Sequence, residues 1–262
     1  MMSFESNNNI KCGVGCEIHE SVEISDGAHI ELGDHCYIGP GVKIMPGNLK
    51  LGDYSKIFDR TFINPMNGIQ LGHLAWVGQN CVLDGTGGIS AGNFLGAGIN
   101  TALYSHIRHG DITEGCLYEN EKKMIIGDDV WFVGMCLVSP IIAEDKSMAM
   151  LGSTIVKNME CNHVYGGSPA KDLTSKIGNP WKNNGTAQKL KLVKDHLDHY
   201  CNEVEPGFEK DSIVVVDEFP KDMDDRSFYN VKTRQYTKNN TRAQVSFNKW
   251  LFKYRAKFVP LV

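Results

Sequence analysis

Two histidines stand close together in a segment that also carries other polar groups. His106 and His109 are three residues apart, with Arg108 and Asp111 beside them. Histidine has an unperturbed pKa near 6.5, so its ring is largely neutral at physiological pH and can accept a proton from a hydroxyl group. The segment 97–111 is therefore a candidate carrier of a general base. The alternative interpretation of Arg108 and Asp111 is that they only keep this segment hydrated.

The chain on both sides of this segment repeats at a step of six. Aliphatic residues recur from Leu32 to Leu95 and again from Ile126, and glycine directly follows six of the eleven in the first run. Apolar residues six apart form no stripe on an α-helix, so the repeat indicates short strands. One inward apolar residue in six, with glycines that permit tight corners, predicts a triangular β-solenoid of stacked parallel strands. The interruption is then a loop extruded from a rigid scaffold, where binding and catalytic groups concentrate.

Three stretches resemble a known family: LGDHCYIGPGVKI, IQLGHLAWVGQNCVL and IIGDDVWFVGMCLVSP. They are similar to the hexapeptide-repeat acyltransferases, and the similarity runs from about residue 14 to about residue 173. The resemblance implies a left-handed parallel β-helix, although parallel crossovers are generally right-handed. It also implies acetyl-CoA as co-substrate, no metal, and a homotrimer whose active sites lie between two chains.

Within that family, the extruded loop looks like that of maltose, galactoside and related sugar O-acetyltransferases. His106, in Tyr104-Ser105-His106, matches their catalytic histidine, and Asp84 resembles the aspartate that opens their Asp-x-x-Gly-Gly-Ile stretch. His106 would accept the proton of a sugar hydroxyl that attacks the thioester, while Asp84 orients the ring or the acceptor. The alternative is that Asp84 only caps a corner. Trp76 stands nearest to the position of the acceptor asparagine in galactoside enzymes, which leaves the acceptor open.

The stretch from Gly152 to Lys171 is similar to the closing signature of the family, which ends in Pro-Ala-Lys. In the family, pantetheine lies along a groove between subunits and a basic residue approaches the nucleotide phosphates. Met150-Leu151 replaces the usual Gly-Ala, and Val133 stands where glycine is usual, so we expect a locally narrowed groove. The residues that the resemblance assigns to the acyl donor are Trp131, Gly134, Gly152, Ser153 and Lys171.

Composition limits the class of protein. The 262 residues carry a formal net charge of −4, and 42% are hydrophobic. No stretch approaches the roughly 20 apolar residues of a membrane span. The eight cysteines form no CxxC pair, and the N-terminus has no secretory signal pattern, so we expect reduced thiols and a cytoplasmic protein. The expected partner is a sugar or nucleotide-sugar acceptor, without nucleic acid.

Several alternatives stay open at this point. N-acetylation of a nucleotide-linked amino sugar is the runner-up, and a β-helix scaffold without activity or a nucleotidyltransferase is a further possibility. A γ-class carbonic anhydrase shares the solenoid and uses three histidines on zinc. His73, His106 and His109 are 33 and 3 residues apart. That class places two of its histidines five apart, so the spacing disfavours it.

The domain organisation is predicted as a β-helix over 1–173, a linker with an amphipathic helix over 174–204, and a small α/β extension over 205–262. Residues 1–179 hold 12 basic and 20 acidic side chains, whereas residues 180–262 hold 15 and 11. The helix is indicated by Leu190, Val193, Leu197 and Tyr200, and 211–216 is a buried-strand candidate. The extension is interpreted as a cap on the open end of the solenoid or as a glycan- or partner-binding surface.

Overall fold

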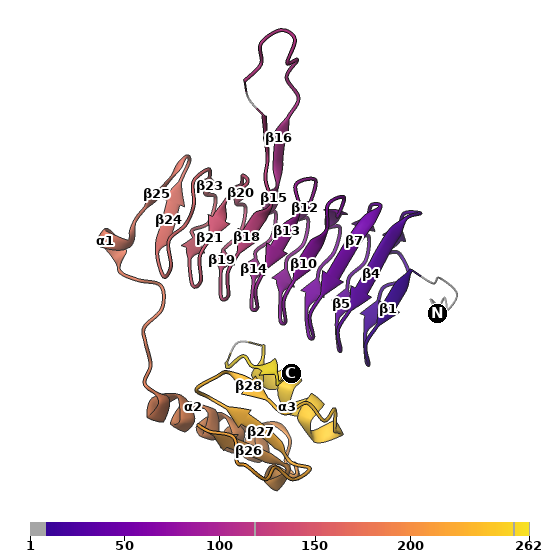
Figure 1. The fold of residues 1–262 in the computed structure, drawn as a ribbon. Helices are drawn as coiled ribbons and strands as arrows, with labels where there is room; N and C mark the ends of the chain where they lie inside the picture. The colour runs from indigo at the N-terminus through magenta and orange to yellow at the C-terminus, as the bar shows by residue number, and fades with distance from the viewer. Residues whose placement is uncertain (1–8, 118, 254, 262) are drawn as a thin grey trace. The chain divides into compact units, whose positions relative to one another are not determined.

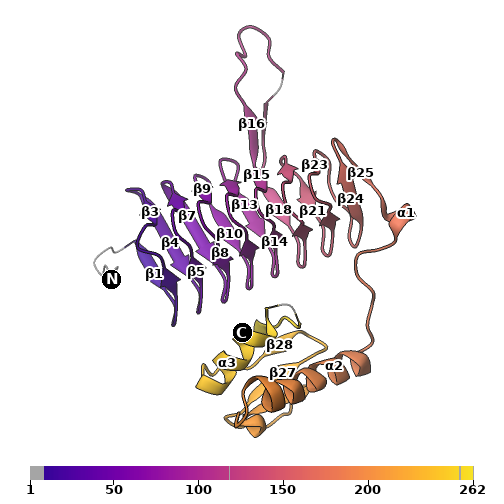
Figure 2. The same ribbon diagram turned by 180° about the vertical axis from the view of Figure 1, so that it is seen from behind.

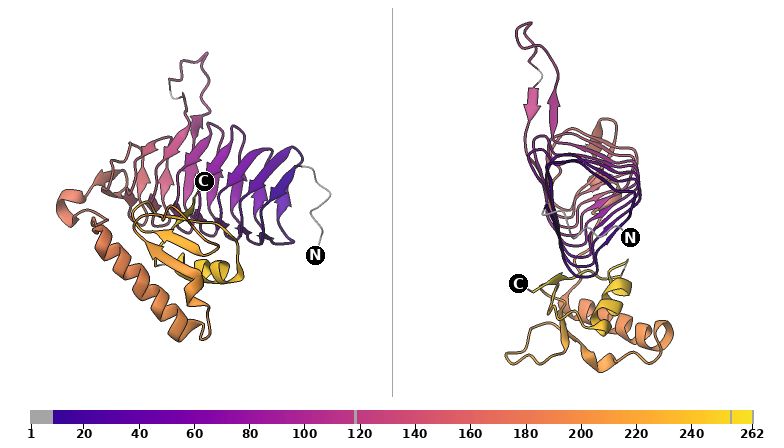
Figure 3. Two further views of the ribbon diagram at one scale, coloured as in Figure 1. Left: turned by 60° about the horizontal axis from the view of Figure 1, so that its bottom comes forward. Right: turned by 90° about the vertical axis from the view of Figure 1, so that its right-hand side faces the viewer.

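The computed structural model describes residues 9–117, 119–253 and 255–261. The chain divides into two compact units, one up to Trp181 and one from Lys182 onwards. The first is a left-handed parallel β-helix built of three sheets (Figures 1 and 2). Seen along its axis, it has three faces that meet at three corners (Figure 3, right). The fold predicted from the six-residue step is confirmed.

Each coil of the β-helix contributes one strand to each sheet, in the order A, B, C, and the chain after residue 155 adds two strands to sheet B alone. Sheet A contains β1 (Ile10–Cys12), β4 (Ala28–Leu32), β7 (Gly47–Leu51), β10 (Ile69–Leu71), β13 (Ile89–Ala91), β18 (Met124–Ile126) and β21 (Ile142–Ala143). Sheet B contains β2 (Glu17–Ile18), β5 (Tyr37–Ile38), β8 (Lys56–Ile57), β11 (Trp76–Val77), β14 (Gly96–Ala97), β19 (Trp131–Phe132), β22 (Met148–Ala149), β24 (Val164–Gly167) and β25 (Ala170–Asp172). Sheet C contains β3 (Glu23–Ile24), β6 (Lys43–Ile44), β9 (Phe62–Asn64), β12 (Val82–Asp84), β15 (Ala102–Tyr104), β20 (Leu137–Val138) and β23 (Thr154–Ile155).

Coil length differs along the β-helix. Leu71 in sheet A pairs with Ala91, twenty residues later. The chain takes twelve residues from Leu71 to Leu83 in sheet C and eight more to return to sheet A. Ile126, by contrast, pairs with Ala143 only seventeen residues later. The longer coils thus carry their extra residues at the corner between sheets C and A, where polar side chains can be added without disturbing the strands.

The inward residues of all three sheets form one apolar core. Their burial supplies most of the driving force, at about 1.5–3 kcal/mol for each large aliphatic side chain. Because parallel strands are hydrogen-bonded on both sides, every coil except the terminal ones is supported by two neighbours. The core includes Ile38, Ile44, Ile57, Ile63, Val77, Leu83 and Phe132, all of them fully buried.

The glycines of the repeat are required by the closeness of adjacent coils. A Cβ on Gly33 would lie 2.3 Å from Asp53 Oδ1, and one on Gly72 would lie 2.6 Å from the carbonyl carbon of Gly92. The left-handed backbone of the same corner falls instead on non-glycine residues such as Leu74, with φ of 58°. The glycines were predicted to permit tight corners; the structure shows that they make room for the next coil.

One corner is held by a continuous ladder of side chains. Between sheets A and B, a side-chain oxygen or ring nitrogen of each coil accepts the backbone N–H of the preceding coil, at 2.6–3.0 Å. These bonds satisfy amide groups that the corner would otherwise leave unpaired. We call this set the corner ladder; its members are Asp34, Asp53, His73, Asn93, Asp128 and Asp145.

The predicted extruded loop is a β-hairpin that projects from the corner between sheets C and A (Figures 1 and 2). Its strands are β16 (His106–Arg108) and β17 (Glu119–Glu121), which pair antiparallel with each other alone. It leaves the β-helix after β15 and returns at β18. His106, the first residue of β16, therefore lies at the base of the hairpin, next to the rigid sheet.

The first unit ends with the short helix α1 (Thr174–Ile177). Beyond it, Asn162 accepts the backbone N–H of Trp181 at 3.1 Å and donates to its carbonyl at 3.2 Å. The segment 174–181 is thereby attached to the last coils of the β-helix. No helix within the described ranges is long and apolar enough to cross a membrane.

The second unit combines two helices with a four-stranded mixed sheet in the order β26–β27–β28–β29. Val193 and Leu197 are buried, and α2 contacts β26, so the predicted amphipathic helix packs within this unit. The 211–216 strand candidate corresponds to β26. The elements are α2 (Thr186–His199), the π-helical turn η2 (Tyr200–Val204), the 3₁₀ turn η3 (Lys210–Ser212), β26 (Ile213–Val216), β27 (Ser227–Asn230), β28 (Gln235–Tyr236), α3 (Arg242–Leu251) and β29 (Val259–Pro260).

Candidate active site

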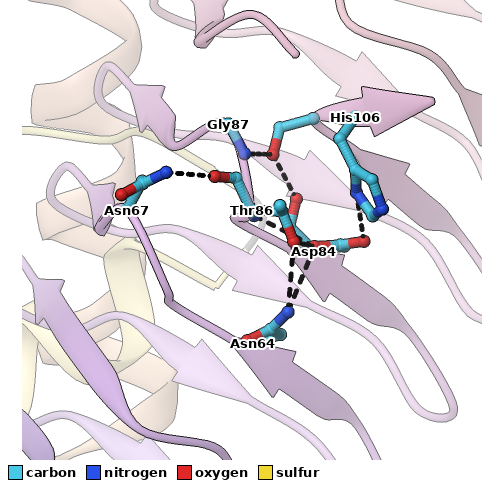
Figure 4. Close-up of polar contacts among 7 residues, drawn as sticks. Asn64, Asn67, Asp84, Thr86, Gly87 and His106 are labelled. Atoms are coloured by element: carbon cyan, nitrogen blue, oxygen red, sulfur yellow. Dashed lines mark hydrogen bonds and ion pairs between the residues drawn. The ribbon is translucent and has the colours of Figure 1, made fainter. Parts of the chain in front are cut away.

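The structure brings His106 and Asp84 together. Asp84 ends β12, and it pairs in sheet C with Tyr104, two residues before His106. Nδ1 of His106 lies 2.9 Å from Oδ2 of Asp84 (Figure 4). Nδ1 is shielded from solvent and Oδ2 lies off the direction of a ring N–H, so the contact is a close electrostatic approach without a well-directed hydrogen bond. The side chain of His106 as a whole stays 29% exposed.

The other carboxylate oxygen of Asp84 is fixed by its own corner. Oδ1 accepts the backbone N–H of Thr86 at 3.0 Å and its hydroxyl at 2.7 Å. Asn64, one coil earlier in sheet C, donates to the same oxygen at 3.3 Å. Because these donors all occupy Oδ1, the carboxylate is held with Oδ2 towards the histidine ring (Figure 4).

Ser105 anchors the base of the hairpin. Its side chain is buried; its backbone N–H and hydroxyl both donate to the carbonyl of Asp84, at 3.0 and 2.6 Å. The same hydroxyl accepts the N–H of Gly87 at 2.8 Å. A Cβ on Gly87 would lie 2.3 Å from the carbonyl oxygen of Ser105, so only glycine fits there. The Asp-Gly-Thr-Gly-Gly corner and the Tyr-Ser-His segment thus form one interlocked structure.

This arrangement can present a basic ring nitrogen to a substrate. If Nδ1, the ring nitrogen nearest Asp84, carries the proton, Nε2 on the far side of the ring keeps a lone pair. A carboxylate beside Nδ1 also stabilises the positive charge that appears when Nε2 takes a proton. The side-chain pair therefore has the layout of a general base with a positioning carboxylate.

Three polar residues around this pair were missed by the sequence analysis. Asn64 and Thr86 hold Asp84, and Asn67 donates through its side-chain amide to the carbonyl of Thr86. The signal that could have found Asn64 is the twenty-residue coil, because residues 64, 84 and 104 fall on one column of sheet C. Trp76, which stood nearest to the acceptor asparagine by sequence, lies on sheet B and not in this column.

The other polar residues of the hairpin lie away from this pair. Arg108 approaches Glu121 across the hairpin, with 3.4 Å between Nη1 and Oε2, and His109 is exposed beyond the end of β16. Asp111 accepts the side chain and the backbone N–H of Thr113, and these hydrogen bonds hold the pKa of Asp111 below its usual range. These contacts shape the hairpin itself.

His73, which a zinc site of the carbonic anhydrase kind would need, belongs to the corner ladder. Its Nδ1 accepts the backbone N–H of Asp53 at 2.9 Å, at the corner between sheets A and B. His106 lies at the corner between sheets C and A, after β15 and before β18. Within the described residues, no group of three or more His, Cys, Asp and Glu side chains could hold a metal ion.

The residues assigned to the acyl donor lie on the late coils. Trp131 faces outward from β19, and Lys171 is exposed on β25. Gly134 and Gly152 stack at the corner between sheets B and C, where the N–H of Gly152 donates to the carbonyl of Gly134 at 3.0 Å. Ser153 is buried, with its hydroxyl bonded to the carbonyl of Met150 at 2.6 Å.

Leu151, one of the departures from the family signature, lies close to this glycine corner. Its Cδ1 is 3.3 Å from the position that a Cβ on Gly134 would take, and 62% of the residue is exposed. The side chain therefore covers part of the surface that the missing Cβ leaves open. The glycine corner and the pair of His106 and Asp84 lie at opposite ends of the strands of sheet C.

Comparisons with known proteins give the context of the β-helix. No model of a protein family matches the chain. The bifunctional protein GlmU of Desulfitobacterium hafniense is 31% identical over 157 residues, which is 57% of this chain and 29% of that protein. That of Clostridium novyi is 32% identical over 161 residues, 59% of this chain and 30% of that protein. The chain thus spans less than a third of the length of these curated relatives.

Solved structures are similar at lower identity. A hexapeptide-repeat acetyltransferase of Vibrio cholerae in complex with acetyl coenzyme A is 17% identical, with a TM-score of 0.39, over 56% of this chain and 69% of the other. A mutant of the N-acyltransferase AntD of Bacillus cereus, in complex with dTDP and coenzyme A, is 17% identical, with a TM-score of 0.39, over 71% and 92%. The resemblance to hexapeptide-repeat acyltransferases that the sequence motifs predicted thus agrees with the curated relatives, which match more than half of this chain.

Proposed function

We propose that this protein transfers an acetyl group from acetyl-CoA to a sugar hydroxyl, with His106 as the general base and Asp84 as its positioning residue. The observation that carries the proposal is the 2.9 Å approach of Asp84 Oδ2 to His106 Nδ1, with Oδ1 held separately by Thr86. A carboxylate tethered in this way selects the ring orientation that leaves Nε2 for the acceptor.

In the proposed reaction, the sugar oxygen attacks the thioester carbonyl while its proton passes to Nε2 of His106. A tetrahedral intermediate forms, and its collapse breaks the C–S bond and expels the CoA thiolate. The imidazolium returns the proton to the sulfur, so that His106 ends neutral and the products are an acetyl ester and free CoA. Asp84 stabilises the imidazolium between these two proton transfers.

The proposal includes a homotrimer with the active site between two chains. Two observations support it. The glycine corner, where we place the acyl donor, and His106 lie at opposite ends of the strands of sheet C, which favours a donor supplied by a second chain. In addition, the outer surface of the coils from β9 onwards exposes large apolar side chains, which favours burial against another chain. These include Phe62, Trp76, Ile125, Trp131, Leu137 and Ile142, all 38–51% exposed.

A thiol-release assay with acetyl-CoA and a panel of sugars tests the activity. We expect CoA release that depends on the acceptor and that His106→Ala abolishes to near background. Hydroxylamine then distinguishes the linkage, since it cleaves acetyl esters and leaves acetamides intact. An amide product would establish the amino-sugar alternative, and the absence of both CoA binding and acceptor-dependent release would reject the enzyme function in favour of a scaffold.

Light scattering tests the assembly. We expect a particle of three times the 29.1 kDa chain mass at micromolar concentration. A monomer that is fully active would overturn the shared active site.

A further inference from the structure

Three cysteines gather in the first two coils of the β-helix, at the end that begins with β1 (Figure 1). Cys12 is the last residue of β1, and Cys16 directly precedes β2. Cys36 directly precedes β5, so it lies beside Cys16 on the next coil, and its carbonyl accepts the N–H of Glu17 at 2.8 Å. The side chain of Cys16 hydrogen-bonds with the side chains of Cys12 and Cys36. We call these three cysteines the thiol cluster.

Access to solvent differs within the thiol cluster. Cys12 is exposed, Cys16 is partly exposed, and Cys36 is buried. Cys12 pairs with Leu32 in the inward column of sheet A, but β1 is the edge strand of that sheet, and this leaves the side chain of Cys12 open. A small molecule in solution can thus reach Cys12 and Cys16 without opening the core.

The fold does not require sulfur at the positions of Cys16 and Cys36. The thiol of Cys16 donates to the carbonyl of Gly33 on the next coil at 3.0 Å, and Cys36 donates in the same way at 3.2 Å. One coil later, the hydroxyl of Ser55 makes the equivalent hydrogen bond at 2.9 Å, and Ala75 follows in the same column. Serine and alanine therefore fit this column, so packing alone gives no reason for two adjacent cysteines.

Cys16 is the most acidic thiol of the cluster. The side chain of Cys36 donates to its sulfur and lowers the pKa of Cys16 to about 7, against the opposing effects of burial and of the Asp34 carboxylate. Burial raises the pKa of Cys12, and the contact with Cys16 together with burial raises the pKa of Cys36. Because the thiolate is the nucleophilic form of cysteine, Cys16 is the member of the cluster that reacts at neutral pH.

We propose that the thiol cluster is a site of thiol–disulfide exchange with low-molecular-weight disulfides, in which Cys16 attacks and Cys12 resolves. Cys36 has a positioning role, since its thiol donates to the sulfur of Cys16 from the buried side. The exchange is separate from acetyl transfer, because the cluster lies in the first two coils, whereas His106 lies at the base of the hairpin between β15 and β18.

The exchange takes place in two steps. In the first, the Cys16 thiolate attacks one sulfur of the small disulfide, whose S–S bond breaks as one small thiolate leaves. In the second, Cys12 loses its proton and attacks the sulfur of Cys16, the mixed disulfide breaks, and the second small thiolate leaves. The protein loses two thiol hydrogens and gains one disulfide across the corner between β1 and β2, while the small disulfide is reduced to two thiols.

The exchange is measured with the full chain, first reduced and then incubated with oxidised glutathione at neutral pH. Free thiols are trapped with N-ethylmaleimide, and the disulfides are mapped by mass spectrometry of peptides. We expect one disulfide between Cys12 and Cys16. Cys12→Ser should stop at a mixed disulfide of glutathione on Cys16, and Cys16→Ser should leave Cys12 as a free thiol. Cys161→Ser, which removes an exposed thiol outside the cluster, should form the disulfide at the wild-type rate.

The pH dependence of the first step tests the role of Cys36. In the Cys12→Ser variant, the rate of adduct formation on Cys16 should be half-maximal near pH 7. Adding Cys36→Ala, which removes the donor, should raise this midpoint by about one pH unit towards the ordinary thiol value of about 8.5, whereas Cys36→Ser, which keeps a donor, should raise it less.

Four outcomes would overturn the proposal. They are a wild-type chain without a disulfide in the cluster, a disulfide between Cys16 and Cys36, adduct formation on Cys161 in preference to Cys16, and a midpoint that Cys36→Ala leaves unchanged. Far-UV circular dichroism of each variant checks that the β-helix is folded, as the serine and alanine of the later coils lead us to expect.

Discussion

Two corners of the same β-helix use carboxylates in different ways. At the corner between sheets A and B, Asp34 and Asp53 each accept a backbone N–H from the preceding coil. At the corner between sheets C and A, Asp84 accepts from Thr86 in its own corner and directs its second oxygen to His106. The first carboxylates hold coils together, whereas the second faces a titratable ring.

The difference shows why residue type alone does not identify a site in a repeat protein. The corner ladder recurs in every coil from β4 to β21, and Asn93 and His73 replace aspartate in it because only an acceptor is needed. Asp84 sits where the coil is longer and where the hairpin leaves the β-helix. A carboxylate that lies outside the corner ladder and beside a polar insertion is the better candidate for a catalytic role.

We expect the largest effect on kcat from replacing His106, at the corner between sheets C and A. His106→Ala should lower kcat by about 10²–10⁴-fold, the usual contribution of a positioned general base, with acetyl-CoA affinity unchanged. His109→Ala is the control, because His109 is exposed beyond β16; we expect a change of about twofold at most. Steady-state kinetics and CoA titration measure both, and similar losses in the two variants would contradict the assignment.

Replacing aspartate by asparagine at each corner tests whether the two carboxylates have different roles. Asp84→Asn should reduce kcat by about 10- to 100-fold, because the amide still accepts from Thr86 but no longer stabilises the imidazolium. Asp53→Asn, the matched change in the corner ladder, should leave kcat unaltered, since Asn93 already fills that role. Full activity in Asp84→Asn would show that Asp84 has only a structural role, like the aspartates of the corner ladder.

Removing the ladder acceptor should affect stability instead of activity. Asp53→Ala leaves the buried N–H of Asp34 without the partner it has at 2.9 Å, which costs about 1–3 kcal/mol of unfolding free energy. Urea unfolding followed by far-UV circular dichroism measures this, and kcat below the transition should match the wild type. Asp53→Asn should retain most of the stability; an equal loss there would mean that charge, and not the acceptor, matters.

We expect the smallest effect, a change in thermal stability, from replacing Asp172 at the end of the β-helix. Hydrogen bonds from the side chain and backbone of Thr174, and then from His163, lower the pKa of Asp172 to about 2. A depressed carboxyl pKa stabilises the fold above its unfolded value of about 4, and this stabilisation is lost as the pH falls through 2. Asp172→Asn should lower Tm by about one or two degrees at pH 7. Scanning calorimetry should show the difference disappearing near pH 2.

The six-residue step determined the β-solenoid, because apolar residues at that spacing form no stripe on a helix but one inward row on each face of stacked strands. The left hand of the coil was implied only by the family resemblance. The interruption after Leu95 and the polar content of 104–111 likewise predicted an extruded loop and placed a histidine on it. The apolar spacing of Val193, Leu197 and Tyr200 was sufficient for α2. In each case the signal is local, since it depends on residues within a few turns of the same chain segment.

The coil register, by contrast, was decided only in three dimensions. A coil of twenty residues stacks Asn64, Asp84 and Tyr104, and this stacking brings Asn64 to Asp84 and the base of the hairpin to the Asp84 carbonyl. The exposed face of α3 likewise depends on which of its side chains the second unit buries. Sequence patterns specify which residues turn inward, but contacts between coils depend on how many residues each corner holds, and only the packed structure fixes that number.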